Sequence, residues 1–196
     1  MNIKVIFVII SSLVGISCFI PYIIDILKRK TKPHVYSWII WTVLQLIGVM
    51  AMIDGGAGLG VMSLLIGAIL CGFIFILSLF YGTHNIKIFD TICLIGAIIS
   101  IIFYFFIHNT LLSIIIVTVT DLVGFMPTFR KSYEEPKTET ISTYVLSSIS
   151  SLFALFALSN ITFTTSLYLI SLIVSNGLCA LIIFLRRKDY FNYIEI

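Results

Sequence analysis

The chain repeats one pattern of residues: positions 19–38 read FIPYIIDILKRKTKPHVYSW, and positions 125–144 read FMPTFRKSYEEPKTETISTY. Each stretch passes from an aromatic residue through a proline and basic residues to a second proline. Each then reaches a hydroxyl residue beside an aromatic ring. The four prolines therefore form two pairs, Pro21 with Pro127 and Pro33 with Pro136. Self-similarity of this kind predicts two equivalent structural units.

The composition around these stretches is that of a membrane protein. The 196 residues are 60% hydrophobic and 11% charged, with a mean hydropathy of +1.15. Soluble domains are typically about 45–50% apolar and about 25% charged. The net charge is +3, from 12 Lys and Arg against 9 Asp and Glu, and the basic residues cluster beside apolar runs and do not form one basic face. We therefore exclude nucleic acid as a partner and expect the lipid bilayer to surround most of the chain.

Seven stretches are long and apolar enough to cross a bilayer, which takes about 20 mostly apolar residues. They cover residues 3–27, 35–53, 58–81, 88–107, 110–129, 140–159 and 162–185. The first apolar run continues beyond the length of a signal peptide, so we expect an uncleaved helix there.

Basic residues predict the direction of these helices. Eleven of the 12 Lys and Arg residues lie beside the connections that follow the first, third, fifth and seventh stretches, and Lys4 lies on the other side. Cytoplasmic loops are enriched in Lys and Arg. We predict a multi-pass protein of the cell (inner) membrane with its N-terminus outside and its C-terminus in the cytoplasm.

The charge pattern and the repeat together predict the architecture. Both proline loops lie on the predicted cytoplasmic side, although three crossings reverse the direction of a chain. One extra helix between the two units restores that direction. We therefore predict an all-α membrane protein with two parallel three-helix bundles, residues 1–83 and 110–188, joined by a linker helix at residues 84–109. Residues 189–196 then form a cytoplasmic tail.

The proline loops and this 3+1+3 plan resemble the SWEET, SemiSWEET and PQ-loop superfamily of small-solute transporters over nearly the whole chain. The glutamine that follows the first proline in that family is replaced by Tyr22 and Thr128. The resemblance implies a solute site between the bundles. It also implies that Asn176 and Cys71 contact the solute, because the family carries an asparagine or a cysteine on its third and seventh helices.

Polar residues of five predicted helices lie at one depth. Asp121, Asn176, Cys71, Gln45 and Ser151 are each nine or ten residues from a predicted cytoplasmic helix end. At the rise of an α-helix this is about 14–15 Å, near the midplane. Polar groups at that depth usually face a cavity or the bundle interior. They form our candidate substrate site, although each could also serve only to join helices.

Further residues receive candidate roles. Asp121 is a candidate for proton coupling, because a midplane carboxylate must be neutral, paired or hydrated. Pro21 and Pro127 are candidate hinges, because each removes a backbone donor inside a helix. Trp41 is a candidate solute contact and Trp38 a candidate gate, although both also suit an aromatic belt at the interface.

Charged residues near the predicted cytoplasmic ends complete the set. Arg130 and Glu134 are candidate gate residues in a segment that otherwise suits a solvated loop. We expect Asp25 and Asp90 to form ion pairs at the surface with nearby lysines and arginines. The chain has three histidines, His34, His84 and His108. They lie at predicted helix ends on both faces of the membrane, so we do not expect them to form one site. The four cysteines, which lie inside apolar runs, suit small core residues.

These features favour a transporter of a small polar solute, such as a sugar, an amino acid or an amine, that works by alternating access. The alternative is a receptor or scaffold with the same seven helices that does not transport. No residue pattern suits catalysis, so we do not expect an enzyme, and we expect no cofactor and no metal. The sequence leaves open whether the protein is a homo-oligomer.

Overall fold

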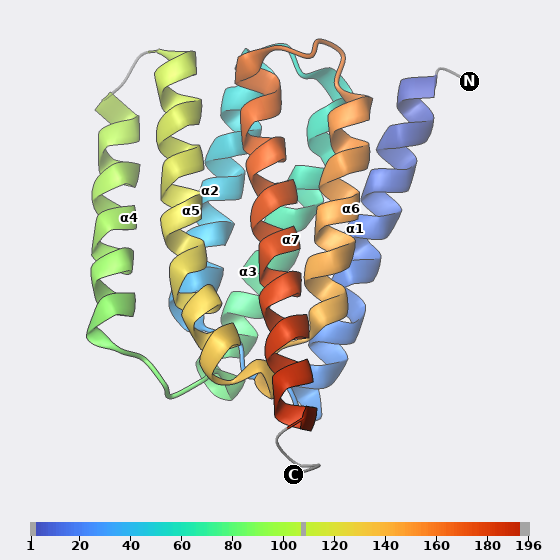
Figure 1. The fold of residues 1–196 in the computed structure, drawn as a ribbon. Coiled ribbons are helices and arrows are strands. Elements are labelled where there is room, and N and C mark those ends of the chain that lie inside the picture. The colour runs from blue at the N-terminus through green and yellow to red at the C-terminus, as the bar shows by residue number, and fades with distance from the viewer. Residues whose placement is uncertain (1–2, 107–108, 193–196) are drawn as a thin grey trace.

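The computed structural model describes residues 3–106 and 109–192, and the side chains as far as residue 188. These residues form seven α-helices and two short 3-10 helices (Figure 1). In chain order they are α1 (Ile3–Leu27), α2 (Val35–Asp54), η1 (Gly58–Val61), α3 (Met62–Tyr81), α4 (Ile88–Phe106), α5 (Thr110–Glu134), η2 (Pro136–Thr138), α6 (Ile141–Ala157) and α7 (Phe163–Asn192).

Six of the described helices are long and apolar enough to cross a membrane, as fits a multi-pass membrane protein. The exception is α6, whose 17 residues are at the short limit of about 17–25 residues for a span. Large apolar side chains also cover the outside of the bundle, as on α4, where Ile88 is 81% exposed and Phe106 is 78% exposed. A surface of this kind requires a lipid environment.

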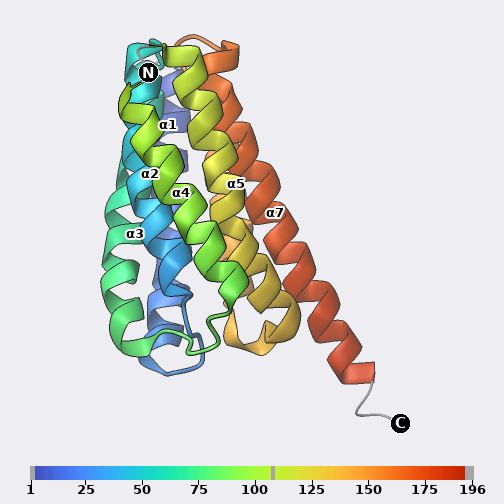
Figure 2. The ribbon, with the colours of Figure 1, turned by 90° about the vertical axis from the view of Figure 1, so that its left-hand side faces the viewer.

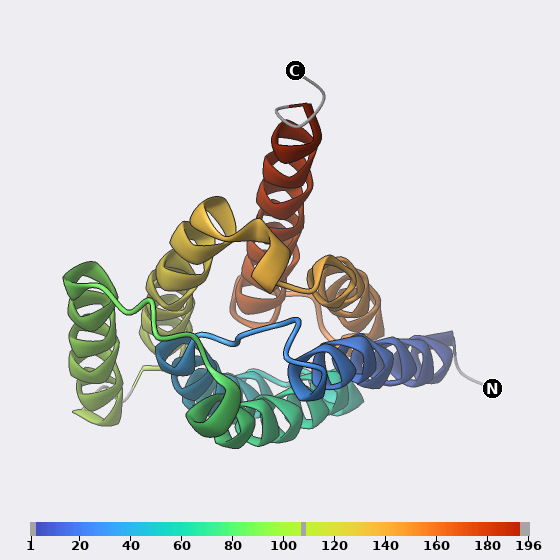
Figure 3. The same cartoon turned by 90° about the horizontal axis from the view of Figure 1, so that it is seen from below.

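The helices pack around a central axis. In Figure 3, α1, α3, α2, α5, α7 and α6 follow one another around a ring, and each packs against its neighbours. Helix α3 thus lies between α1 and α2, and α7 lies between α5 and α6. Helix α4 stands outside this ring, where it packs mainly on α5 and also touches α2 (Figure 2).

Nearly all basic residues lie at one end of the bundle, which we call the basic end. The α1–α2, α3–α4 and α5–α6 connections and the last turns of α7 gather there (Figure 1). Nine of the 12 Lys and Arg residues belong to these segments, Arg130 and Lys131 lie in the last turns of α5 at the same end, and Lys4 lies at the opposite end. The first described residues of α1 and the last of α7 lie at opposite ends, as an odd number of helices requires.

The prolines occupy the predicted places. Pro21 lies inside α1 and Pro127 inside α5. Pro33 lies in the α1–α2 connection, and Pro136 is the first residue of η2, where its missing backbone donor costs nothing. Helix α5 extends five residues beyond its predicted end at residue 129, because the side chain of Lys131 is buried in the bundle and not in a solvated loop.

Candidate functional site

A pocket of about 80 Å³ lies inside the ring of helices. Residues from α1, α2, α3, α5, α6 and α7 line it, and α4 contributes none of the described lining residues. The volume is well below the range of about 300–1,000 Å³ typical of sites for drug-sized ligands. It has room for several water molecules or a small solute.

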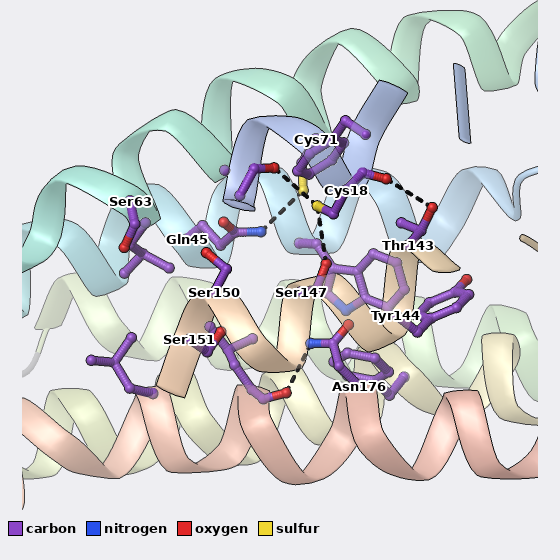
Figure 4. A pocket seen from close by; sticks show the side chains of 18 of the residues that line it. Cys18, Gln45, Ser63, Cys71, Thr143, Tyr144, Ser147, Ser150, Ser151 and Asn176 are labelled. Carbon is purple, nitrogen blue, oxygen red and sulfur yellow. Dashed lines mark hydrogen bonds between the residues drawn. The ribbon is translucent and has the colours of Figure 1, made fainter. Parts of the chain in front are cut away.

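Five of the six predicted substrate residues line this pocket: Asn176, Cys71, Gln45, Ser151 and Trp41. They come from four helices and are far apart in the sequence. The amide Nε2 of Gln45 donates to Cys71 Sγ at 3.0 Å, and Asn176 Nδ2 donates to the Leu172 carbonyl of its own helix at 2.8 Å (Figure 4). That they bind a solute stays a prediction.

The sixth residue, Asp121, is buried outside the described lining of the pocket. The hydroxyl of Tyr168 donates to its Oδ1 at 3.3 Å. Its other oxygen, Oδ2, has no hydrogen-bond partner among the described residues. The predicted depth of Asp121 along its helix therefore did not show which way its side chain points. A residue at the depth of the pocket can still face a neighbouring helix.

Hydroxyl groups of α6 form one wall of the pocket, and only Ser151 of this set was predicted. Thr143, Ser147 and Ser150 also line it. Ser147 Oγ donates to Cys18 Sγ at 3.3 Å (Figure 4). Ser150 Oγ donates to the Ser11 carbonyl at 2.7 Å. Their spacing of four and three residues, which places side chains on one helix face, was the signal that could have found them.

The four cysteines are buried and free, as expected for small core residues. Two of them, Cys18 and Cys71, also line the pocket. The other two are Cys93 on α4 and Cys179 on α7, where Cys179 Sγ lies 3.6 Å from Ser132 Oγ. The pocket therefore exposes two of the four thiols to whatever enters it.

Asp90 is fully buried, which contradicts the expected ion pair at the surface. Its carboxylate accepts two hydrogen bonds from the guanidinium of Arg130, with Nε to Oδ1 at 3.0 Å. It also accepts the backbone amide of Lys87 at 2.8 Å and lies 3.2 Å from His34 Nε2. Burial is possible because each carboxylate oxygen has a donor, so that its charge is compensated. These hydrogen bonds join α4 and α5 to the residue that precedes α2.

Asp25 also differs from the expectation. Within the described residues it forms no ion pair with Lys28 or Arg29. Its Oδ2 accepts a hydrogen bond from Thr140 Oγ1 at 2.9 Å instead. The partner of Asp25 is thus a neutral hydroxyl, where the end of α1 meets the start of α6.

His34, which precedes α2, belongs to the Asp90 cluster and is fully buried. Because a carboxylate can only accept, the proton of a neutral His34 ring lies on Nε2. Burial lowers the pKa of His34, although the negative charge of Asp90 acts in the opposite direction. His34 Nδ1 has no partner among the described residues. The ring is therefore held neutral. His108 lies outside the described residues.

Two of the predicted gate residues, Arg130 and Glu134, lie in this same cluster at the side of the bundle. Arg130 bonds Glu134 one turn later on α5 as well as Asp90, and Lys87 Nζ contacts Glu134 at 2.6 Å. The third predicted gate residue, Trp38, lines the pocket. Of the three, only Trp38 is among the described lining residues of the pocket.

A second buried ion pair, between Lys131 and Glu139, lies at the basic end and was predicted as part of a solvated loop. The side chain of Lys131 is 0% exposed and that of Glu139 is 1% exposed. The hydroxyls of Tyr22 and Tyr144 donate to Glu139 Oε2 at 3.2 and 2.9 Å. The sequence offered Lys131 and Glu139 among charges that could latch an inner gate, with a solvated loop as the simpler expectation, but it gave no sign of the two tyrosine partners, which come from α1 and α6.

Comparison of the chain with protein-family models, with curated proteins and with solved structures gives no match.

Proposed function

We propose that the protein is a membrane transporter of a small polar solute that works by alternating access. The observation that carries the proposal is a pocket at the centre of six helices, lined from all of them and carrying hydroxyl and amide side chains among apolar ones. Transporters built from repeats bind their solutes at such an interface. The resemblance to the SWEET, SemiSWEET and PQ-loop superfamily supports the same conclusion.

The pocket lining supports two repeats of three helices with α4 as their linker. Many lining residues occur in pairs that are 106 residues apart in the first two helices of each unit and 105 apart in the third. The pairs are Phe19 with Phe125, Trp38 with Tyr144, Trp41 with Ser147, Gln45 with Ser151, Leu64 with Leu169, Gly67 with Leu172, and Cys71 with Asn176. A two-fold axis along the pocket relates such pairs in a parallel 3+1+3 arrangement.

Equivalent hydrogen bonds support the same relation. Ser37 Oγ of α2 donates to the Gly124 carbonyl of α5 at 2.9 Å. Thr143 Oγ1 of α6 donates to the Cys18 carbonyl of α1, also at 2.9 Å. Donors and acceptors in the two bonds are each 106 residues apart. Helix packing follows the same rule, since α1 packs on α6 as α5 packs on α2.

The lining also favours an uncharged solute. The described lining residues include no aspartate, glutamate, lysine, arginine or histidine. A charged solute would lose its hydration there without gaining a partner of opposite charge. The hydroxyls of α6 and the amides of Gln45 and Asn176 suit a solute with several hydrogen-bonding groups, such as a sugar. An amine is less favoured, because Asp121 lies outside this lining.

Alternating access needs positions at which the helices can bend, and it needs a defined orientation of the protein in the membrane. We propose that Pro21 and Pro127 act as hinges, because the missing amide leaves the carbonyl four residues earlier without its helical donor. The basic end then faces the cytoplasm and the start of α1 faces outside. Coupling to a proton through Asp121 would act through the α5–α7 contact, since Tyr168 of α7 is its partner.

Counterflow in proteoliposomes tests the proposal. Vesicles loaded with an unlabelled hexose, a neutral amino acid or a charged amine are diluted into the same labelled solute. We expect accumulation of at least one uncharged solute and a loss of tenfold or more in Asn176→Ala. The control is Asn160→Ala, at an exposed loop position. Binding without accumulation of any solute would favour a receptor and refute the transporter.

Proton coupling has its own test. If Asp121 carries the proton, Asp121→Asn abolishes uptake driven by a pH gradient but retains counterflow. An unchanged pH dependence in Asp121→Asn would remove the proton from the mechanism and leave the transporter in place.

A further inference from the structure

One carboxylate, that of Glu139, gathers donors from three helices at the basic end. Lys131 of α5 donates through Nζ to Oε1, while Tyr22 of α1 and Tyr144 of α6 donate to Oε2. The backbone carbonyl of Glu139 accepts from Arg187 of α7. We call Glu139, Lys131, Tyr22 and Tyr144 the Glu139 cluster. It connects α1 with the helices that follow α4.

The connections on either side of this cluster also meet. The backbone amide of Lys32 donates to the Thr138 carbonyl at 3.1 Å. Thr31 Oγ1 lies 2.6 Å from Thr140 Oγ1. Lys32 and Thr138 are 106 residues apart, so the two proline loops touch at equivalent positions. The two proline loops therefore hold each other together at the basic end.

Aromatic rings fill the space between the cluster and the pocket. The Tyr22 ring lies 5.0 Å from that of Trp38 and 6.5 Å from that of Tyr144, between centroids. Phe19 lies 6.2 Å from Trp38. Trp38, Phe19 and Tyr144 all line the pocket, whereas Tyr22 is not among the described lining residues. Tyr144 alone of the cluster thus reaches both the pocket and Glu139.

We propose that the Glu139 cluster is the gate that closes the pocket at the basic end, and that Tyr144 links this gate to the pocket. The inference rests on the proposed function, because a gate requires a pathway. Opening would separate Tyr22 and α1 from Glu139. Because a carboxylate that loses its donors must be rehydrated, opening has a substantial cost in the resting protein. A solute that draws the Tyr144 hydroxyl toward itself weakens the same closure.

The pocket thiols report on this gate without any knowledge of the solute. In a Cys93→Ala, Cys179→Ala background, Cys18 and Cys71 remain, and both line the pocket. A membrane-impermeant methanethiosulfonate with a trimethylammonium group is applied from the basic-end side of vesicles, and the labelled fraction is followed by mass spectrometry. We expect Tyr144→Phe and Tyr22→Phe each to speed labelling roughly tenfold, since each removes a hydrogen bond to a charged group.

Matched variants separate this gate from the cluster at the side of the bundle. Glu139→Gln should speed labelling at least as much as the tyrosine variants, whereas Glu134→Gln should leave the rate unchanged. Tyr133→Phe, at an exposed tyrosine, controls for loss of a hydroxyl. The tyrosine variants keep the test decisive if Glu139→Gln, which leaves Lys131 without a charged partner, fails to fold.

Unchanged labelling in both Tyr22→Phe and Tyr144→Phe, or equal acceleration in Glu134→Gln, would overturn the proposal. Labelling is independent of transport. Faster labelling with no counterflow of any solute would therefore refute the transporter and leave the Glu139 cluster as the closure of a pocket that does not transport. Counterflow with unchanged labelling would do the reverse.

Discussion

Replacing Asp90 with asparagine should destabilise the protein far more than any change at an exposed acid. The carboxylate accepts bonds from Arg130, from the Lys87 amide and from His34. Asparagine has nearly the same shape, but it offers one acceptor oxygen in place of two. Its amide group would also face donors. Asp90→Asn therefore removes the only negative charge that the described residues place at the centre of this buried cluster.

The cost can be worked from these contacts. Removing one partner of a buried ion pair costs about 3–5 kcal/mol. The side chain of Arg130 is 15% exposed and retains Glu134 and the Asn85 carbonyl, so it is not left without partners. We therefore expect the lower end of the range, about 3 kcal/mol. At about 2–4 °C per kcal/mol for a chain of this size, Tm falls by roughly 6–12 °C.

Thermal unfolding of the purified protein in detergent, followed by the fluorescence of Trp38 and Trp41, measures this change. Glu134→Gln is the control, because Glu134 bonds the same Arg130 but is 33% exposed, and partly exposed pairs contribute about 0–1 kcal/mol. Equal Tm values for Asp90→Asn and the parent protein, or an equal loss in Glu134→Gln, would refute the reasoning.

Two other predictions concern stability. Burial lowers the pKa of His34 below its ordinary value of 6.5, so the unfolded chain binds a proton more readily than the folded protein does. The stability that His34 contributes is therefore present above pH 6.5 and is lost as the pH falls. Tm should therefore drop more steeply below about pH 6.5 in the parent protein than in His34→Gln, which keeps a donor for Asp90; parallel pH profiles would contradict this. Gly60→Val should cost about 1–3 kcal/mol, because a Cβ there would lie 3.1 Å from Leu158 Cα and 3.2 Å from its backbone nitrogen. Gly96→Val is the matched control, since nothing lies within 4 Å of a Cβ at Gly96, and equal losses of Tm in the two variants would exclude the close packing as the cause.

Predictions that depend on local pattern agree with the structure. Most helices begin and end within a few residues of the predicted apolar stretches, but α7 continues to Asn192, beyond the predicted end at residue 185 and into the predicted tail. Helix α5 continues to Glu134 because Lys131 finds a buried partner in Glu139. Helix α6 is shorter than predicted and ends at Ala157, where Leu158 leaves the helical conformation.

Several lining residues of the pocket were named from the sequence, and their role as a solute site stays a prediction. Gln45, Asn176 and Cys71 were chosen by depth and by resemblance, and they line one pocket. Depth fixes the height of a residue on its helix, but the direction of its side chain depends on how that helix is rotated. Asp121 shows the difference, since it lies at the right height and faces Tyr168.

Hydropathy, the alternation of basic loops and the paired prolines are properties of the chain read in order. They were enough to identify a multi-pass helical protein and to predict an internal repeat. The buried charges could not be found in this way. Tyr22 and Glu139 are 117 residues apart, and Asp90 and Arg130 are 40 apart. Whether a charge is solvated or buried depends on which groups surround it in space. Only the packing of the helices brings those donors together.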